Sequence, residues 1–164
     1  MLSKLKKKLR GDRSPNLSST ELIKEDALAQ LMYYDTHFLT DDSYSMVVSR
    51  WNQARHALMG LAAHALKFDQ DGIEISFLNH IDSGRTNEEE VWQLLCSIQP
   101  NNGTPTGRRL GQIFSAYITK IEAAKTKSRG ADPSQSGIKP LDLIVITNGE
   151  PSDDPESVFV AAAH

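Results

Sequence analysis

Oxygen-bearing side chains gather in Asp41-x-Ser43-x-Ser45, directly after the short apolar run Phe38-Leu39. The alternate spacing allows one carboxylate and two hydroxyls to face a single point on a curling loop. A hard cation such as Mg²⁺ prefers this oxygen set in octahedral geometry, with waters completing the shell. The same residues are also compatible with a simpler role, in which Ser43 or Ser45 caps the helix that follows.

Two later loops place polar side chains in a similar setting. Proline and glycine force a loop over residues 99–107, in which a threonine hydroxyl can face a metal or a phosphate. This loop is not a P-loop, because no Gly-Lys-Ser/Thr follows it. The third loop, residues 147–155, follows the most continuous apolar run of the chain. Each loop therefore follows an element that can hold it in place.

Hydrophobic periodicity predicts the elements that position these loops. Apolar runs predict strands ending at Leu39 and over 73–78 and 141–147, and helical spacing predicts helices over 19–31, 47–68, 88–98, 106–121 and 156–164. Residues 79–87 are expected to form a polar loop. A strand, a helix and a second strand in this order make a parallel unit. The expected fold class is therefore α/β, with the loops at the carboxyl ends of the strands, where such sheets bind ligands.

The composition is that of an ordinary globular domain. Of 164 residues, 39% are hydrophobic and 24% charged, which is enough to form a core. The net charge of −3 and the pI near 5.9 argue against a nucleic-acid partner, which would select a basic face. No apolar run approaches the roughly 20 residues that span a bilayer, and no signal peptide is recognisable, so we expect a cytoplasmic protein without a membrane span.

The chain divides into two regions. Residues 1–19 combine a basic cluster with glycine, proline and serine, which predicts a flexible arm, and residues 20–164 form the predicted domain. The single cysteine, Cys96, cannot form an internal disulfide. It lies in an apolar run, so it is interpreted as a residue that fills the core.

The three loops together resemble a von Willebrand factor type A (vWA) domain. The resemblance rests on Asp41-x-Ser43-x-Ser45, on residues 103–107 (Gly-Thr-Pro-Thr-Gly) and on residues 146–150 (Ile-Thr-Asn-Gly-Glu), in that order. The flanking residues are similar to those of intracellular fungal members. The resemblance covers residues 21–164 and implies a Rossmann-like fold, with a central, mostly parallel sheet flanked by helices.

The resemblance further implies a metal-ion-dependent adhesion site (MIDAS). Asp41, Ser43, Ser45 and Thr104 would hold one Mg²⁺, Mn²⁺ or Ca²⁺ ion, and the third loop would complete the site at Asn148. An Asp or Glu of a protein partner would take the open coordination position. The implied function is protein–protein interaction, and no enzyme activity is expected.

The sequence departs from the family pattern in three places. Asn148 stands where the third loop normally has Asp, so we expect Mg²⁺ binding to be weak or absent. The bulky Tyr44 occupies a position that is frequently glycine. The family's domain continues for two more strands, so the domain is expected to be incomplete after His164. If the sheet follows the family's order, the strand over 141–147 pairs with the first strand on one side, and its other edge is bare and favours self-association.

Three alternatives remain open at this stage. The first is a degenerate scaffold that binds no metal. The second is a phosphatase of the haloacid dehalogenase type with Asp41 as nucleophile, although that chemistry needs Asp-x-Asp and position 43 is Ser. The third is a two-component receiver with Asp41 and Asp42 as the acidic pair and Asp82 as the phosphate acceptor, although Asp82 follows the second strand by several residues.

Overall fold

A computed structural model describes residues 30–68, 71–80, 85–127 and 137–163. Its strands form one sheet in the order β3-β2-β1-β4. The central strand pairs in parallel with a neighbour on each side, and the shortest strand pairs antiparallel at one edge. The strands are β1 (Asp35–Thr40), β2 (Ile73–Phe77), β3 (Arg85–Thr86) and β4 (Leu141–Ile146). The fold class is therefore α/β, and the predicted pairing of the first strand with the strand at 141–147 is confirmed.

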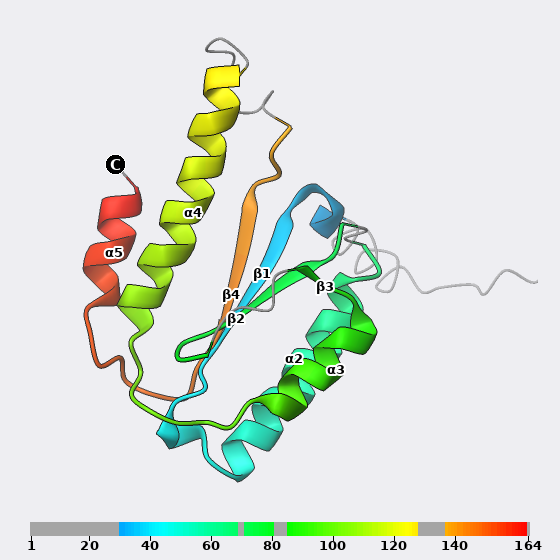
Figure 1. The fold of residues 1–164 in the computed structure, drawn as a ribbon, viewed down its shortest axis with the longest axis vertical. Helices are drawn as coiled ribbons and strands as arrows, with labels where there is room; N and C mark the ends of the chain where they lie inside the picture. Colours follow the sequence, from blue (N-terminus) through cyan, green and yellow to red (C-terminus); the bar gives the residue numbers. More distant parts are fainter. Residues whose placement is uncertain (1–29, 69–70, 81–84, 128–136, 164) are drawn as a thin grey trace, which may run out of the picture.

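In the described part of the chain, helices lie on both faces of the sheet (Figure 1). One pair packs against the face that carries Phe38, and the other pair lies on the face that carries Leu39. The helices are α2 (Ser49–Ala65) and α3 (Glu88–Ser97) on the first face, and α4 (Thr106–Lys127) and α5 (Pro155–Ala162) on the second. Two short 3₁₀ helices, η1 (Gln30–Tyr33) and η2 (Tyr44–Met46), flank β1.

The alternation of side chains along β1 divides the core into two parts. Even-numbered Phe38 joins the larger cluster with α2 and α3, which includes Trp51, Leu58, Ile75, Phe77 and Leu95. Odd-numbered Leu39 joins a smaller cluster with Leu78, Leu110 and Ile113 on the α4 side. This division follows from the two-residue period of a strand. Among the described residues, the cluster on the α4 side has four buried apolar residues, against thirteen in the other cluster.

Side-chain acceptors fix the beginnings of three helices. Asn87 forms a capping box at α3, with its side chain accepting from the backbone N–H groups of Glu89 and Glu90. Asp154 caps α5 through the N–H groups of Glu156 and Ser157, and Asp153 accepts from the first N–H groups of α4. These contacts satisfy N–H groups that have no partner inside a helix. They therefore fix the residues at which α4 and α5 begin.

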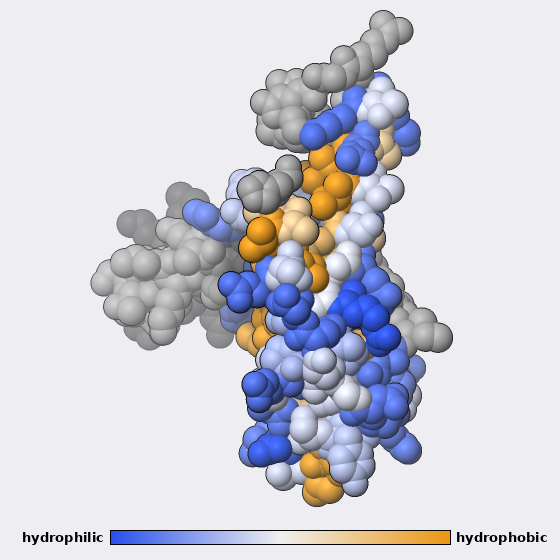
Figure 2. Space-filling view, turned by 90° about the vertical axis from the view of Figure 1, so that its left-hand side faces the viewer, coloured by the Kyte–Doolittle hydropathy of each residue, from blue (hydrophilic) through white to orange (hydrophobic). Residues whose placement is uncertain are grey.

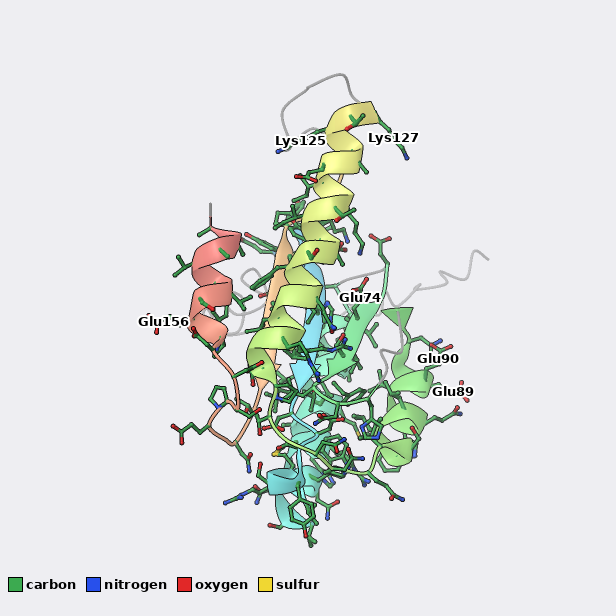
Figure 3. All side chains as sticks on the ribbon, turned by 60° about the vertical axis from the view of Figure 1, so that its left-hand side comes forward. Glu74, Glu89, Glu90, Lys125, Lys127 and Glu156 are labelled. Carbon is green, nitrogen blue, oxygen red and sulfur yellow. The ribbon has the colours of Figure 1, made fainter. Side chains whose placement is uncertain are left out.

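Charged side chains at the helix ends complement the helix dipoles. Figure 3 shows Glu89 and Glu90 at the start of α3, Glu156 in the first turn of α5, and Lys125 and Lys127 at the end of α4. Negative charge near the N-terminus and positive charge near the C-terminus stabilise a helix by about 0.3–1 kcal/mol each at exposed sites. The two lysines therefore stabilise the C-terminal end of the long α4, which packs little against the sheet.

Two expectations for α3 and its preceding loop are wrong. Cys96 is exposed and does not fill the core, and Trp92 is also exposed. The helix buries only the stripe that contains Val91 and Leu95, and Trp92 instead lies beneath the guanidinium of Arg55, 5.7 Å from the ring centroid. In addition, the predicted polar loop over 79–87 contains β3.

Some predictions fall on residues that are not described. The flexible arm over 1–19 and most of the helix predicted over 19–31 lie outside the described residues. Within the described part of the chain, no helix combines the length and apolar character needed to cross a membrane.

The β4 side of the molecule exposes apolar side chains. β4 is the last strand of the described sheet on this side. Val145 on β4 and Phe159 and Val160 on α5 are 38%, 51% and 56% exposed. Figure 2 shows hydrophobic residues gathered over this face. An apolar edge strand is a template for pairing with another chain.

We expect Val145→Lys to reduce self-association of this chain, because a lysine on an edge strand opposes pairing with a second strand. Light scattering over a concentration series would measure it. Leu61→Lys is the control, since Leu61 is an exposed apolar residue of α2, away from the edge. Equal self-association of the Val145→Lys variant and the unmodified chain would exclude the β4 edge as the contact.

A tight approach between α4 and α5 predicts a specific cost at Gly107. A Cβ atom there would lie 2.7 Å from the backbone oxygen of Asp154, so Gly107→Ala should lower the free energy of unfolding by about 1–3 kcal/mol. Gly60 lies in the middle of α2 with nothing within 4 Å of its Cβ position. Gly60→Ala should therefore raise the free energy of unfolding by roughly 0.5–1 kcal/mol. Urea unfolding of both variants measures the contrast, and equal effects would contradict it.

Candidate functional site

Three loops meet at the carboxyl ends of the strands, at the lower end of Figure 1. They are residues 41–48, 98–105 and 147–154. The parallel register of β1 and β4 places Thr40 opposite Ile146, and the N–H of Asp41 donates to the carbonyl of Ile146 at 2.8 Å. The first residues of the first and third loops therefore leave the sheet side by side.

Asp41 is held at the base of these loops. Its side chain is 1% exposed, and each carboxylate oxygen has a donor. Oδ1 accepts from the backbone N–H of Ser43 at 2.9 Å, and Oδ2 accepts from the hydroxyl of Thr147 at 2.8 Å. Thr147 was not among the predicted site residues. Its position directly after β4, beside the predicted Asn148, is the signal that could have identified it.

A row of hydrogen bonds connects the buried Ser43 to the surface. The Ser43 and Ser45 hydroxyl oxygens are 2.8 Å apart, and Ser45 Oγ donates to Asn148 Oδ1 at 3.0 Å. Because the single hydroxyl proton of Ser45 points to Asn148, Ser43 is the donor to Ser45. Asn148 Nδ2 donates in turn to the carbonyl of Ser45 at 3.2 Å. The structure thus brings together four of the five predicted site residues.

The chemistry and spacing of this set fit a hard cation. The predicted donors are a carboxylate, two hydroxyls and an amide oxygen, all of the type that Mg²⁺ selects. In an octahedron with metal–oxygen bonds of about 2.0–2.1 Å, adjacent ligands are separated by roughly 2.9 Å. The Ser43–Ser45 and Ser45–Asn148 oxygen distances of 2.8 and 3.0 Å match this separation.

Thr104, the fifth predicted residue, is joined to the loops through its backbone. It is buried, and its carbonyl accepts from the N–H of Thr106 at 2.8 Å and of Ser152 at 2.9 Å. Among the described residues, no hydrogen bond joins Thr104 to the other four predicted site residues. It therefore ties the second loop to the third, and its place beside an ion remains a prediction.

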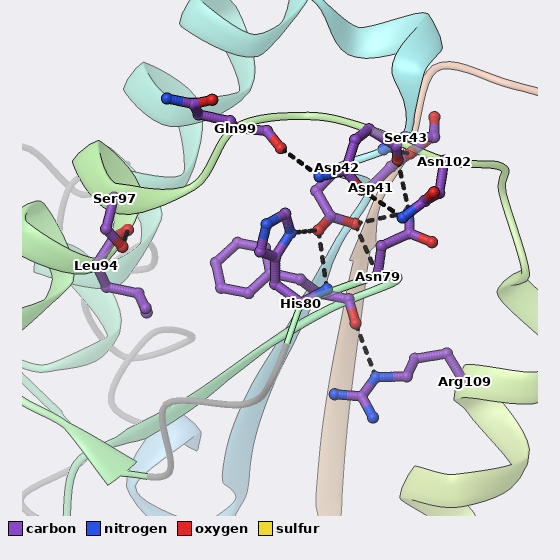
Figure 4. Close-up of polar contacts among 12 residues, drawn as sticks. Asp41, Asp42, Ser43, Asn79, His80, Leu94, Ser97, Gln99, Asn102 and Arg109 are labelled. Atoms are coloured by element: carbon purple, nitrogen blue, oxygen red, sulfur yellow. Dashed lines mark hydrogen bonds and ion pairs between the residues drawn. The ribbon is translucent and has the colours of Figure 1, made fainter.

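A second carboxylate anchors the loops from below. Asp42 is fully buried, and Oδ1 accepts from the backbone N–H and the side-chain amide of Asn79 at 2.9 and 3.2 Å (Figure 4). Oδ2 accepts from the N–H of His80 at 3.1 Å and also contacts His80 Nδ1. The Asn79 amide also donates to the carbonyls of Asn101 and Gly103. Asp42 therefore connects the first loop to β2 and, through Asn79, to the second loop.

Sequence reasoning misses this anchor because Asn79 and His80 lie in the predicted polar loop over 79–87, where nothing marks them as partners of Asp42. A usable signal is present, since both residues directly follow the predicted strand over 73–78. Polar residues just after a parallel strand reach the same edge as those after its neighbours.

Three other acids near the loops, Asp42, Asp153 and Asp154, have hydrogen-bond partners outside the predicted ligand set. Asp153 and Asp154 accept from N–H groups at the beginnings of α4 and α5, and Asp42 is held by Asn79 and His80. Within the described residues, no group of three or more His, Cys, Asp or Glu side chains is placed to hold a metal. An ion at the predicted site would thus have one carboxylate from this set and otherwise neutral oxygens.

The same contacts bear on the receiver interpretation. Asp41 and Asp42 turn to different partners, one toward Thr147 and the other toward His80, so they do not form a shared acidic pair. Asp82, the acceptor in that interpretation, lies outside the described residues.

Comparison with known proteins identifies no relative. No family model matches the chain, and neither the curated proteins nor the solved structures contain a significant match.

The buried anchor predicts a large effect on stability. Asp42→Asn would set a side-chain N–H₂ group against donors of Asn79 or His80, and should lower the free energy of unfolding by about 3 kcal/mol. Asp71→Asn is the control, because Asp71 is 64% exposed and pairs with Lys139 at the surface, where an ion pair contributes about 0–1 kcal/mol. Equal losses in chemical unfolding would show that the Asp42 contacts do not stabilise the fold.

Proposed function

We propose that this chain is a vWA-type binding module with a Rossmann-like fold, and that it contacts a protein partner in the cytoplasm through a divalent cation. The observation that supports the proposal best is the row of oxygens from Ser43 through Ser45 to Asn148, next to Asp41, whose Oδ1 accepts from the backbone N–H of Ser43. Two adjacent parallel strands deliver these residues to one point. Their oxygen chemistry and spacing suit Mg²⁺ or Mn²⁺.

Each residue has a distinct role in this proposal. Asp41 supplies the negative charge, Ser43 and Ser45 supply hydroxyl oxygens, and Asn148 supplies a carbonyl oxygen, with Thr104 as the donor from the second loop. Ser45 and Asn148 are exposed, so the outer side of the row is open to a partner. When bound, the ion provides a coordination position for a partner's Asp or Glu. The residues themselves bind and orient the ion.

Asn148 limits the affinity of the proposed site. A carboxylate there would add a negative charge next to a divalent ion, and Coulomb attraction between unit charges about 4 Å apart is on the order of 4 kcal/mol near a protein surface before desolvation is discounted. The amide retains the oxygen but loses this attraction. The proposal therefore includes weak Mg²⁺ binding, in the millimolar range.

A scaffold that binds no metal is the second candidate, and one observation favours it. Asn148 uses its oxygen and its nitrogen on Ser45, so these loops are internally hydrogen-bonded without an ion. Aspartate at this position cannot donate to the Ser45 carbonyl. The two candidates therefore differ in what Asn148→Asp would do.

The Asn148→Asp variant tests the proposal. Without metal it should be less stable by about 1 kcal/mol, because the bond from Nδ2 to the Ser45 carbonyl is lost. With metal it should bind Mg²⁺ at least about tenfold more tightly, which corresponds to 1.4 kcal/mol of added attraction. Calorimetric titration with Mg²⁺ and Mn²⁺ measures the affinity. Gln93→Glu, on the exposed side of α3, adds the same charge on an element that supplies none of the proposed ligands, and should leave the affinity unchanged.

The carboxylate partner is tested with Mn²⁺ and acetate. If acetate binds the protein-bound ion, we expect its protons to relax faster with protein and Mn²⁺ together than with Mn²⁺ alone. Asp41→Ala should remove this difference. If the chain binds Mn²⁺ without the acetate effect, the ion site exists but does not recruit a carboxylate partner. If neither the natural chain nor Asn148→Asp binds Mg²⁺ or Mn²⁺, the scaffold that binds no metal is supported.

A further inference from the structure

A polar cavity lies between the sheet and α4, away from the loop site. Its volume is about 140 Å³, whereas a cavity needs only roughly 10–15 Å³ on this measure to hold one water. The cavity therefore has room for a small molecule. Its lining includes His37, Glu74, Ser76, Arg109, Gln112 and Lys120.

Three of these residues form a connected row across β1 and β2. His37 lies opposite Glu74 in the parallel register, and Ser76 is two residues further along β2, so all three side chains share the α4 face of the sheet. His37 Nδ1 is 3.2 Å from Glu74 Oε2, and His37 Nε2 is 2.7 Å from Ser76 Oγ. Glu74 is labelled beside α4 in Figure 3.

The chemistry of the three groups sets the direction of these bonds. An ionised carboxylate only accepts hydrogen bonds, so Glu74 selects the imidazole tautomer with its proton on Nδ1. Nε2 of His37 is then an acceptor, and the Ser76 hydroxyl donates to it. A serine that donates to an imidazole held by a carboxylate is the arrangement of an activated nucleophile.

Neighbouring groups hold the row in place. Lys120 Nζ is 3.5 Å from Glu74 Oε1, and the His37 contact uses the other carboxylate oxygen, Oε2. Arg109 donates through Nε to the carbonyl of Phe77 at 2.7 Å and through Nη1 to Gln112 Oε1 at 2.7 Å. The second bond fixes the amide of Gln112, whose nitrogen is a donor that can serve a developing negative charge in the cavity.

We propose that Ser76 is the nucleophile of an acyl-transfer site in this cavity, with His37 as general base and Glu74 as the positioning residue. Ser76 and His37 are 2% and 6% exposed, so the hydroxyl is reached through the cavity. The volume selects small, short-chain acyl esters. The proposal is independent of the ion site and of the binding function proposed above.

The reaction is balanced with water as the only co-substrate. Ser76 Oγ bonds to the ester carbonyl carbon while its proton passes to His37 Nε2. The bond from that carbon to the alcohol oxygen breaks, and the proton on Nε2 passes to the departing oxygen. Water then attacks the acyl–Ser76 ester with His37 again as base, releasing the carboxylic acid and restoring the Ser76 hydroxyl.

The test uses 4-nitrophenyl acetate with the full chain in a Cys96→Ser background, since the exposed Cys96 would itself react. We expect release of 4-nitrophenol and an acetyl group on the peptide that contains Ser76. Ser76→Ala and His37→Asn should lower the acylation rate by about 100-fold or more. Glu74→Gln should lower it at least about tenfold, with partial recovery in Glu74→Asp, which a purely structural role would not produce.

Controls separate the site from non-specific acylation and from misfolding. Ser115→Ala removes an exposed serine of α4 that does not line this cavity, so it should retain the full rate. Ser76→Cys preserves the packing and a nucleophile, and should carry the acetyl group as a thioester. The proposal is overturned if the folded chain is not acetylated at Ser76, or if the rate is the same in folded His37→Asn.

Discussion

The central position of β1 is the constraint on which the rest of the structure depends. Because β1 pairs in parallel on both sides, the chain leaving it emerges between the ends of β2 and β4. Asp41 then meets Thr147 from one neighbour, and Asp42 meets Asn79 and His80 from the other. Two adjacent carboxylates consequently have separate roles, one in the candidate site and one as the buried anchor of the loops.

The strands and the candidate loops were predictable because their signals are local. Apolar runs mark β1, β2 and β4, and the spacing of Asp41, Ser43 and Ser45 is visible without a structure. The anchor at Asp42 was not predictable in the same way, because its partners lie 37 and 38 residues away. The sequence around a carboxylate in a polar stretch does not show whether water or a buried amide donates the hydrogen bonds that it accepts.

Helix faces show a different limit of sequence reasoning. The spacing of apolar residues predicts which side of a helix can be buried, but it does not determine how much of that side meets a neighbour. α3 packs along the stripe of Val91 and Leu95 and leaves Trp92 and Cys96 at the surface. The outer part of α4 behaves similarly, since its apolar residue Ile118 is exposed. Polar contacts across strands, such as His37 with Glu74, are likewise set by register.

The alternation of β1 has a consequence for how the chain can misfold. His37 and Asp41 are four residues apart, about 13 Å along a strand, and both have the odd numbering of the α4 face. A slip of one residue in strand pairing would exchange that face with the one that carries Phe38. The polar cavity would then receive a phenyl ring, and the large apolar cluster would receive an imidazole. A register slip moves every side chain of the strand to the other face at once, so it is strongly disfavoured during folding. The polar residues of β1 therefore contribute to selecting the correct register.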